Sequence, residues 1–300
     1  MLQTAELLKK VRKLEIVTRR KVTDAISGAY HSVFKGRGIE FDEVREYTFE
    51  DDVRDIDWNV SARLNAPFVK KYVEERELTV LLMVDTSSSM YFGPAGSKVC
   101  ERAVEAAAML GLSAMKNNDR VGLMLFSDRV EKLLMPRSGR HNRLRLIREL
   151  IAAAGTGQPR TTDIASALRH GCSILKKRSV IFLISDLTAG GAELEKALRI
   201  ASRRHEVIVL HVFEPAMFVL PREVKNIYDA ESGIFHRISS RRSIRKVVDA
   251  ARQQMDINRS MCRRSGADLL ELAGGQDVAT ELMKYFLRRK KQRNNSFNGS

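Results

Sequence analysis

The sequence predicts an α/β protein with a doubly wound, mostly parallel sheet, preceded by an N-terminal helix and a small antiparallel β extension. Two observations carry this prediction. Apolar runs of strand length recur after residue 78 with helical sequence between them, and charged and aromatic residues alternate between residues 35 and 77. Continuous apolar strands alternating with helices are typical of a parallel sheet that helices cover on both faces. At 300 residues and 44% hydrophobic composition, the chain can bury a full-sized core.

Residues 1–34 are predicted to form a basic amphipathic helix. Leu7, Val11 and Leu14 fall on one stripe, and Lys and Arg cover the remainder. Two interpretations stay open: a helix docked on its own domain, or peripheral contact of the basic face with a membrane surface. The segment is too charged for a signal peptide, and no later apolar run approaches the roughly 20 residues that cross a bilayer. We therefore expect a cytoplasmic protein.

Residues 35–77 are predicted to form the antiparallel β extension. The stretches FDEVREY and PFVKKYVEERE have the period of two expected of strands with one buried face. The tripeptide Asn65-Ala66-Pro67 is predicted to make a turn between two of these strands.

A dense polar group in the extension surrounds the only tryptophan, Trp58. Arg54 can donate two hydrogen bonds to one carboxylate, and Trp58 can bury its ring while its indole N–H finds an acceptor. We expect this group to attach the extension to the main domain, with an interaction surface as the alternative. Its other members are Asp51, Asp52 and Asp57.

Residues 78–290 are predicted to form the main domain, and residues 291–300 a disordered tail. Between residues 215 and 236 the pattern is less regular, and an edge hairpin is predicted around residues 231–233. The predicted strands are 79–84, 121–126, 180–185, 207–212 and 267–272. The predicted helices are 98–116, 142–153, 163–176, 192–203, 243–264 and 277–288.

Oxygen-bearing side chains gather where the predicted strands end. In a doubly wound sheet, ligands bind outside the carboxyl ends of the strands. Asp85, Ser87 and Ser89 follow the first strand of the main domain, Thr161, Thr162 and Asp163 open a helix, and Ser185 and Asp186 end the VIFLI strand. Hydroxyl and carboxylate oxygens suit Mg²⁺, with Mn²⁺ as a close substitute. These loops contain no histidine or cysteine, which argues against zinc.

These residues resemble the metal-ion-dependent adhesion site of von Willebrand factor A domains. The run RVGLMLFSD at 120–128 is also typical of the second long strand in those domains. More narrowly, GRGIEFDEVREYTFEDDVRDIDWNVSAR at 36–63, followed by VKKYVEERELTVLLMVD, resembles a bacterial von Willebrand A-like family of uncharacterised function that is encoded beside MoxR-type ATPases. The resemblance covers nearly the whole chain.

The resemblance implies a Rossmann-like domain and a metal contacted by Ser87, Ser89 and Thr162, with Asp85 and Asp186 acting directly or through water. It also implies a MoxR-type AAA+ ATPase as the partner. One position departs from the family pattern: many such sites have glycine between the two serines, and this chain has Ser88. Ser88 gives this loop less backbone freedom than glycine would.

Several of these residues also have ordinary structural interpretations. Ser87 or Ser89 can cap the helix that follows, and Asp163 can be a helix-start acid. The loop GTGQPRTT lacks the ending of a phosphate-binding P-loop, and the sequence has no GxSxG elbow. Metal-assisted hydrolysis would need a general base, for which Asp163 is the only local candidate. We therefore expect a protein that is not an enzyme.

The expected function is metal-dependent binding of an acidic protein surface. The formal net charge of +15 supports an alternative, binding to nucleic acid or another anionic surface. Recognition motifs for nucleic acid are missing and aromatic residues make up only 6%, so no specific nucleic-acid partner is expected. Cys100, Cys172 and Cys262 form no CxxC pair, which fits a reducing compartment.

Overall fold

The computed structural model describes residues 24–34, 40–49, 51–73, 77–93, 99–155, 160–219, 226–228, 235–237 and 241–297. The chain divides into two compact units. One is Phe34–Leu78, and the other combines Met1–Val33 with Thr79–Ser300. The predicted basic helix over residues 7–18 lies outside the described residues. Of the helices that the structure describes, none has both the length and the apolar character needed to cross a bilayer.

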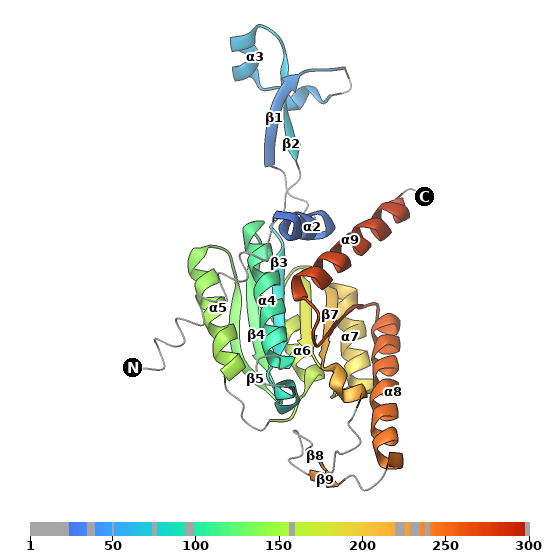
Figure 1. Cartoon of the computed structure of the whole chain (residues 1–300). Coiled ribbons are helices and arrows are strands. Elements are labelled where there is room, and N and C mark those ends of the chain that lie inside the picture. The colour runs from blue at the N-terminus through green and yellow to red at the C-terminus, as the bar shows by residue number, and fades with distance from the viewer. Residues whose placement is uncertain are drawn as a thin grey trace. The chain divides into compact units, whose positions relative to one another are not determined.

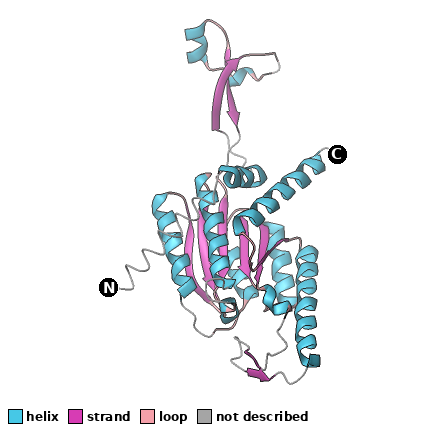
Figure 2. Cartoon of the chain, viewed as in Figure 1, coloured by secondary structure: helices cyan, strands magenta, loops and turns pink. Residues whose placement is uncertain are grey.

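The larger unit contains a six-stranded sheet, and the apolar runs predicted five of its strands, all except β5 (Figures 1 and 2). Its strands are β3 (Thr79–Asp85), β4 (Arg120–Phe126), β5 (Val130–Arg137), β6 (Val180–Ser185), β7 (Glu206–Phe213) and β10 (Asp268–Ala273). Its helices are α2 (Asp24–Phe34), α4 (Val99–Lys116), α5 (Arg140–Gly155), α6 (Ile164–Ile174), α7 (Ala192–Arg204), α8 (Arg241–Ser265) and α9 (Val278–Phe297), with short 3-10 helices at Ser88–Tyr91 and Pro215–Phe218.

The strand order is β10-β7-β6-β3-β4-β5, and every neighbouring pair is parallel except β4 and β5. The chain first builds outward from β3 through β4 to β5, and then returns to the other side of β3 to add β6, β7 and β10. The order of the strands therefore reverses between β3 and β6. Such a reversal leaves a crevice at the carboxyl ends of the two strands, where ligands bind in doubly wound folds.

Helices cover both faces of the sheet, which confirms the doubly wound prediction (Figure 1). Helix α4 packs with α5 and α9, and α6 packs with α7, which in turn contacts α8. The central strands are buried on both faces as a result: Leu81, Met83 and Leu183 have no exposed surface. The mainly aliphatic runs at β3 and β6 are the sequence signature of such strands.

The edge strand β5 was not predicted. Its sequence, VEKLLMPR, mixes charged with apolar residues and contains Pro136. It pairs antiparallel with β4 in an irregular register, and only Leu134 and Pro136 of the strand are buried. Proline and alternating burial are both usual on an edge strand. Gly122 of β4 is required here, because a Cβ at this position would lie 2.9 Å from the carbonyl oxygen of Leu134.

The smaller unit is an antiparallel pair with a helix between its strands. Strands β1 (Glu40–Glu46) and β2 (Phe68–Val73) pair with one irregularity, and α3 (Trp58–Leu64) follows a 3-10 turn at Val53–Asp55. The antiparallel pair is confirmed, but a purely β extension is wrong. Asn65, at φ 52°, ends α3, so the Asn65-Ala66-Pro67 turn joins a helix to a strand and does not join two strands.

The polar residues around Trp58 make hydrogen bonds within this unit, and the Trp58 ring is not buried. The side chain of Asp57 accepts hydrogen bonds from the backbone N–H groups of Asn59 and Val60 and so caps α3. Asp51 accepts a hydrogen bond from Arg45 and another from the backbone of Thr48. Trp58 is 67% exposed, so the expectation of a buried ring is wrong.

Two smaller predictions on the C-terminal part need correction. The expected tail at 291–300 is helical as far as Phe297, because α9 continues through Lys, Arg and Gln residues that are good helix formers. Strands β8 (Asn226–Tyr228) and β9 (Phe235–Arg237) pair antiparallel, as a hairpin requires, but they form a separate two-stranded sheet and are not an edge of the main one. Residues 231–233 lie outside the described part.

Candidate metal centre

The predicted ligands Asp85 and Asp186 lie at the strand reversal. Asp85 is the last residue of β3, and Asp186 directly follows β6, the neighbouring strand in the sheet. Ser87 is the N-cap residue of the 3-10 helix that follows β3, and Ser89 lies within that helix. The two strands run parallel, so both loops leave the sheet at the same edge. Residues a hundred positions apart in the chain therefore lie side by side, as the hydrogen bond from Ser185 to Asp85 shows.

Asp85 is 1% exposed, and both of its carboxylate oxygens accept hydrogen bonds. Oδ1 accepts from the backbone N–H of Ser87 at 2.9 Å, and Oδ2 accepts from the Ser185 hydroxyl at 2.7 Å. Burial, and after it the negative charge of Asp186, raise the pKa of the Asp85 carboxyl to about 7. These hydrogen bonds oppose that shift. Asp85 is thus held in place by hydrogen bonds. Its ionised form is unfavourable when no cation is near.

The hydroxyls of Ser87 and Ser89 face each other, with 3.2 Å between their oxygen atoms. Ser87 is fully buried and occupies the N-cap position of the 3-10 helix, but its side chain makes no capping hydrogen bond. The ordinary capping interpretation therefore does not account for the Ser87 hydroxyl. An arrangement of two hydroxyl oxygens at this spacing can present both to one small cation.

Asp186 joins the same cluster through Thr188. The Thr188 hydroxyl donates to Asp186 Oδ1 at 3.0 Å and lies 3.5 Å from the Ser89 hydroxyl oxygen. The backbone N–H of Thr188 also donates to Asp186 Oδ1, at 3.2 Å. Asp186 is therefore fixed at the rim of the crevice beside Ser89.

Hydrogen bonds hold the segment that contains Thr162 on both sides, to the serine loop on one side and to the residue that follows β4 on the other. On one side, the Arg160 backbone N–H donates to the Ser88 hydroxyl at 2.6 Å, and the Ser88 N–H donates to the Arg160 carbonyl at 3.0 Å. On the other side, the Asp163 N–H donates to the carbonyl of Ser127 at 3.0 Å. Ser88, which replaces the glycine of many related loops, thus links the serine loop to the threonine segment.

Asp163 has the structural role that the sequence left open. Its carboxylate accepts a hydrogen bond from the backbone N–H of Ser166 at 2.8 Å, which caps α6. A carboxylate used in this way stabilises the helix start. Its capping role weakens the case for Asp163 as a general base.

Sequence reasoning placed Ser185 among the oxygen-bearing side chains at the strand ends, but it gave Ser185, Thr188 and Asn258 no role in positioning the ligands. Ser185 holds Asp85 and also accepts from the backbone N–H of Leu187, which has the left-handed φ of 53°. The Asn258 side chain, from α8, donates to the Leu187 carbonyl at 3.3 Å. The SDLT stretch at 185–188 was a signal for two of them, Ser185 and Thr188, because both polar residues flank Asp186. Asn258 could not be found in this way, since it lies 71 residues further along the chain.

The residues present fit a hard divalent cation. Neither Asp85 nor Asp186 forms an ion pair with any residue that the structure describes, so two neighbouring carboxylates lack a cationic side chain. Within the same residues, no group of three His, Cys, Asp or Glu side chains is placed to hold a metal. The donors gathered here are instead mainly hydroxyls, which suit Mg²⁺ or Mn²⁺ and not zinc.

The fold and this site define an α/β domain with a cluster of carboxylate and hydroxyl side chains at the strand reversal. The chain belongs to the family described as "Protein of unknown function DUF58", which matches residues 43–257. It is 29% identical over 285 residues to the uncharacterized proteins Mb1516 of Mycobacterium bovis and Rv1480 of Mycobacterium tuberculosis. Each alignment covers 94% of this chain and 89% of the relative.

Solved structures of similar outline include the conserved hypothetical protein BatB from Bacteroides thetaiotaomicron, with 16% identity and a TM-score of 0.47. That similarity covers 71% of this chain and 99% of BatB. The VWA domain of SpRpn10 has 14% identity and a TM-score of 0.39, covering 69% of this chain and 95% of that domain. Identities and TM-scores this low transfer neither a function nor a ligand to the present chain.

Proposed function

We propose that the protein is a non-enzymatic, metal-dependent protein-interaction module that binds an acidic residue of its partner through Mg²⁺. The observation that supports this most is the hydrogen-bonded cluster of Asp85, Ser87, Ser89 and Asp186 at the strand reversal. Ser87, Ser89 and Thr162 would hold the ion, with Asp85 and Asp186 acting directly or through water. The bound ion would supply a positive charge that attracts a carboxylate oxygen.

The chain's own residues would prepare the crevice for this exchange. Ser185 and the Ser87 backbone hold Asp85 in one orientation, and Thr188 does the same for Asp186. A site whose ligands are already positioned loses less entropy when it binds. The capping role of Asp163 supports a binding function over metal-assisted hydrolysis, because the one local candidate base is engaged elsewhere.

For the partner, we propose a MoxR-type AAA+ ATPase in the cytoplasm, with this protein as its adaptor. This part of the proposal rests on the sequence motifs at 36–63 and 85–89. The net charge of +15 supports a second candidate, attraction to nucleic acid or another anionic surface. The two candidates differ in their response to salt, because binding through many phosphate contacts falls steeply as salt rises.

A pull-down from native cytosol tests the proposal. The wild-type protein and Asp85→Ala are compared in Mg²⁺ and in EDTA, with Asp163→Ala as the control because it removes an acid from the same region. We expect one partner, identified as an AAA+ ATPase, with the wild type and Asp163→Ala in Mg²⁺ only. Capture of the same proteins in every condition would refute a metal-mediated contact. Capture of nucleic acid that disappears with moderate salt would favour the second candidate.

A further inference from the structure

A basic cavity lies at the edge of the sheet opposite the metal centre. It has a volume of about 660 Å³ and is lined by the end of β5 and by one face of α5. Asp85 lies at the far end of β3, six residues along from Thr79, which pairs with Arg120. At about 3.3 Å per residue, roughly 20 Å of sheet separates the two places. The lining residues are Arg137, Ser138, His141, Asn142, Leu144, Arg145 and Arg148.

The cavity gathers positive charge without a matching carboxylate among its lining residues. Arg137 and Arg145 are exposed, and neither forms an ion pair with any residue in the described ranges. Arg148 is partly compensated by Glu149, which lies 2.8 Å away. Arg145 and Arg148 are three residues apart on α5, a spacing at which like charges repel on a helix. An anionic ligand would relieve this repulsion.

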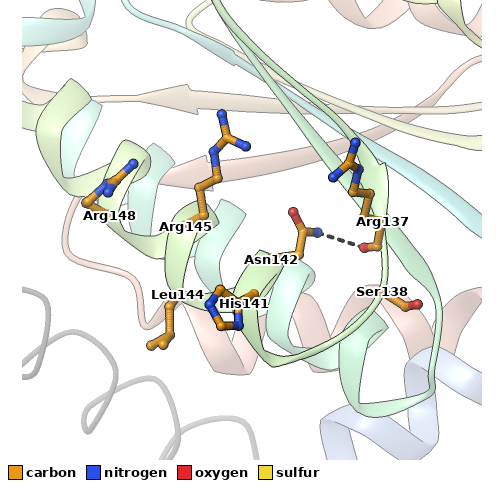
Figure 3. A pocket seen from close by; sticks show the side chains of 7 residues that line it. All are labelled: Arg137, Ser138, His141, Asn142, Leu144, Arg145 and Arg148. Atoms are coloured by element: carbon orange, nitrogen blue, oxygen red, sulfur yellow. Dashed lines mark hydrogen bonds between the residues drawn. The ribbon is translucent and has the colours of Figure 1, made fainter.

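Asn142 fixes the geometry of the cavity. Its side-chain amide donates to the backbone carbonyls of Val121 at 2.8 Å and of Arg137 at 2.7 Å, which ties the start of α5 to the start of β4 and the end of β5. Figure 3 shows the guanidinium groups of Arg137 and Arg145 pointing to the same side of this amide. Asn142 therefore ties together the backbone segments from which the two arginine side chains extend.

We propose that this cavity binds a phosphate-bearing small molecule. Guanidinium groups donate paired hydrogen bonds to phosphate and carboxylate alike. A terminal phosphate carries more charge and three acceptor oxygens, so a single group can engage two arginines at once. The volume falls in the range of small-molecule sites and exceeds what one inorganic phosphate needs. Leu144 and the ring of His141 supply surface for the uncharged part of the ligand.

Calorimetric titration with pyrophosphate and with ATP tests this proposal. Each titration is made in EDTA, so that the proposed metal centre does not contribute. A negative result for the metal centre can then be told apart from a negative result for this cavity. Arg137→Gln with Arg145→Gln should weaken binding by about tenfold or more, because charged hydrogen bonds are lost. Arg203→Gln with Arg242→Gln, which removes equal charge from exposed positions on α7 and α8, should bind as the wild type does. Arg145→Lys keeps the positive charge but loses the paired hydrogen bonds of the guanidinium group. Its affinity should lie between those of the wild type and the Arg137 and Arg145 double variant.

The source of the phosphate is decided with vesicles of phosphatidylcholine, with and without phosphatidic acid. Binding only to phosphatidic acid vesicles, lost in the Arg137 and Arg145 variant, would assign the site to a lipid headgroup. Binding to the soluble probes, lost in the same variant, would assign it to a free metabolite. The proposal is overturned by an equal loss in both double variants, by the lack of any binding to the wild type, or by a polyglutamate peptide that binds as tightly as pyrophosphate.

Discussion

The two edges of the central sheet carry opposite charges and are built in different ways. At the carboxyl edge, buried acidic and hydroxyl side chains hold one another through short hydrogen bonds around Asp85. At the opposite edge, exposed arginines surround an open cavity, where Asn142 holds the backbone of Arg137 and Glu149 pairs with Arg148. We proposed a cation at the first edge and an anion at the second. Both groups of side chains border the same sheet. They differ because different turns and helix starts follow the strands at each end.

The comparison teaches that the two edges depend on different parts of the fold. The acidic edge needs the reversal between β3 and β6, in the middle of the sheet. The basic edge needs β5, the antiparallel edge strand that brings Arg137 beside α5. Changes at the centre should therefore act on the cation site, and changes at the margin on the anion site.

The largest effect should come from Asp85→Ala at the acidic edge. At a Mg²⁺ concentration a hundred times its dissociation constant, binding stabilises the folded wild type by about 2.7 kcal/mol. The variant should lose this stabilisation entirely, as measured by thermal unfolding with and without Mg²⁺. Asp163→Ala, the control, should lose about 1 kcal/mol from its helix cap but keep the response to Mg²⁺. An unchanged response in Asp85→Ala would mean that the ion binds elsewhere.

Gly122→Ala should act on the basic edge. The added Cβ would meet the Leu134 carbonyl oxygen and Pro136 Cγ, both at 2.9 Å, and so push β5 away from β4. Such overpacking should cost about 2 kcal/mol in the free energy of unfolding in urea. Gly28→Ala in α2, where a Cβ has open space, should instead stabilise the protein by up to about 1 kcal/mol.

The same variant sharpens the contrast between the edges. Gly122→Ala should weaken pyrophosphate binding while leaving the stabilisation by Mg²⁺ intact. A loss of both pyrophosphate binding and stabilisation by Mg²⁺ would show that the two edges are coupled and do not act independently.

Ser185→Ala should have a smaller effect, again on the acidic edge. It removes one hydrogen bond to Asp85 and leaves the N–H of Leu187 without that acceptor, at a cost of about 1.5 kcal/mol. Because Ser185 positions a ligand, the affinity for Mg²⁺ should fall about 10- to 100-fold. Ser173→Ala, an exposed serine on α6, serves as the control and should change neither quantity. Full Mg²⁺ affinity in Ser185→Ala would remove its positioning role.

The smallest effect should be that of Trp58→Ala, outside both edges. Because the ring is 67% exposed, the free energy of unfolding should change by less than about 0.5 kcal/mol. Val69→Ala, which empties a buried position of the same unit, should cost about 1.6 kcal/mol. Neither variant should alter Mg²⁺ or pyrophosphate binding. A large loss of stability in Trp58→Ala would restore the idea that the ring is buried against another part of the protein.

The sequence predicted the centre of the sheet well and its margin poorly. Strands such as β3 and β6 are buried on both faces, so their runs of aliphatic residues stand out from the helices around them. Strand β5 has one exposed face and a proline, which leaves no continuous apolar run to find. Helix α3 was also missed, because its short sequence WNVSARL lies within a segment of alternating charged residues.

The same limit applies to the two candidate sites. Asp85, Ser87 and Ser89 are neighbours in the chain, so their spacing already indicated the cluster. The contact between Ser185 and Asp85 depends on strand order, which no local pattern contains. The basic cavity depends on the pairing of β5, so a reading that misses this strand also misses the cavity.

The long separation between β3 and β6 has a consequence for synthesis of the protein. Asp85 reaches its hydrogen-bond partner Ser185 only after a hundred further residues have been made. A nascent chain that stops before residue 180 has the serine loop but neither Ser185 nor Asp186, so it cannot complete the crevice. Capture of the ion would thus report that translation has passed β6, and truncated chains released early would be unable to compete for the same partner.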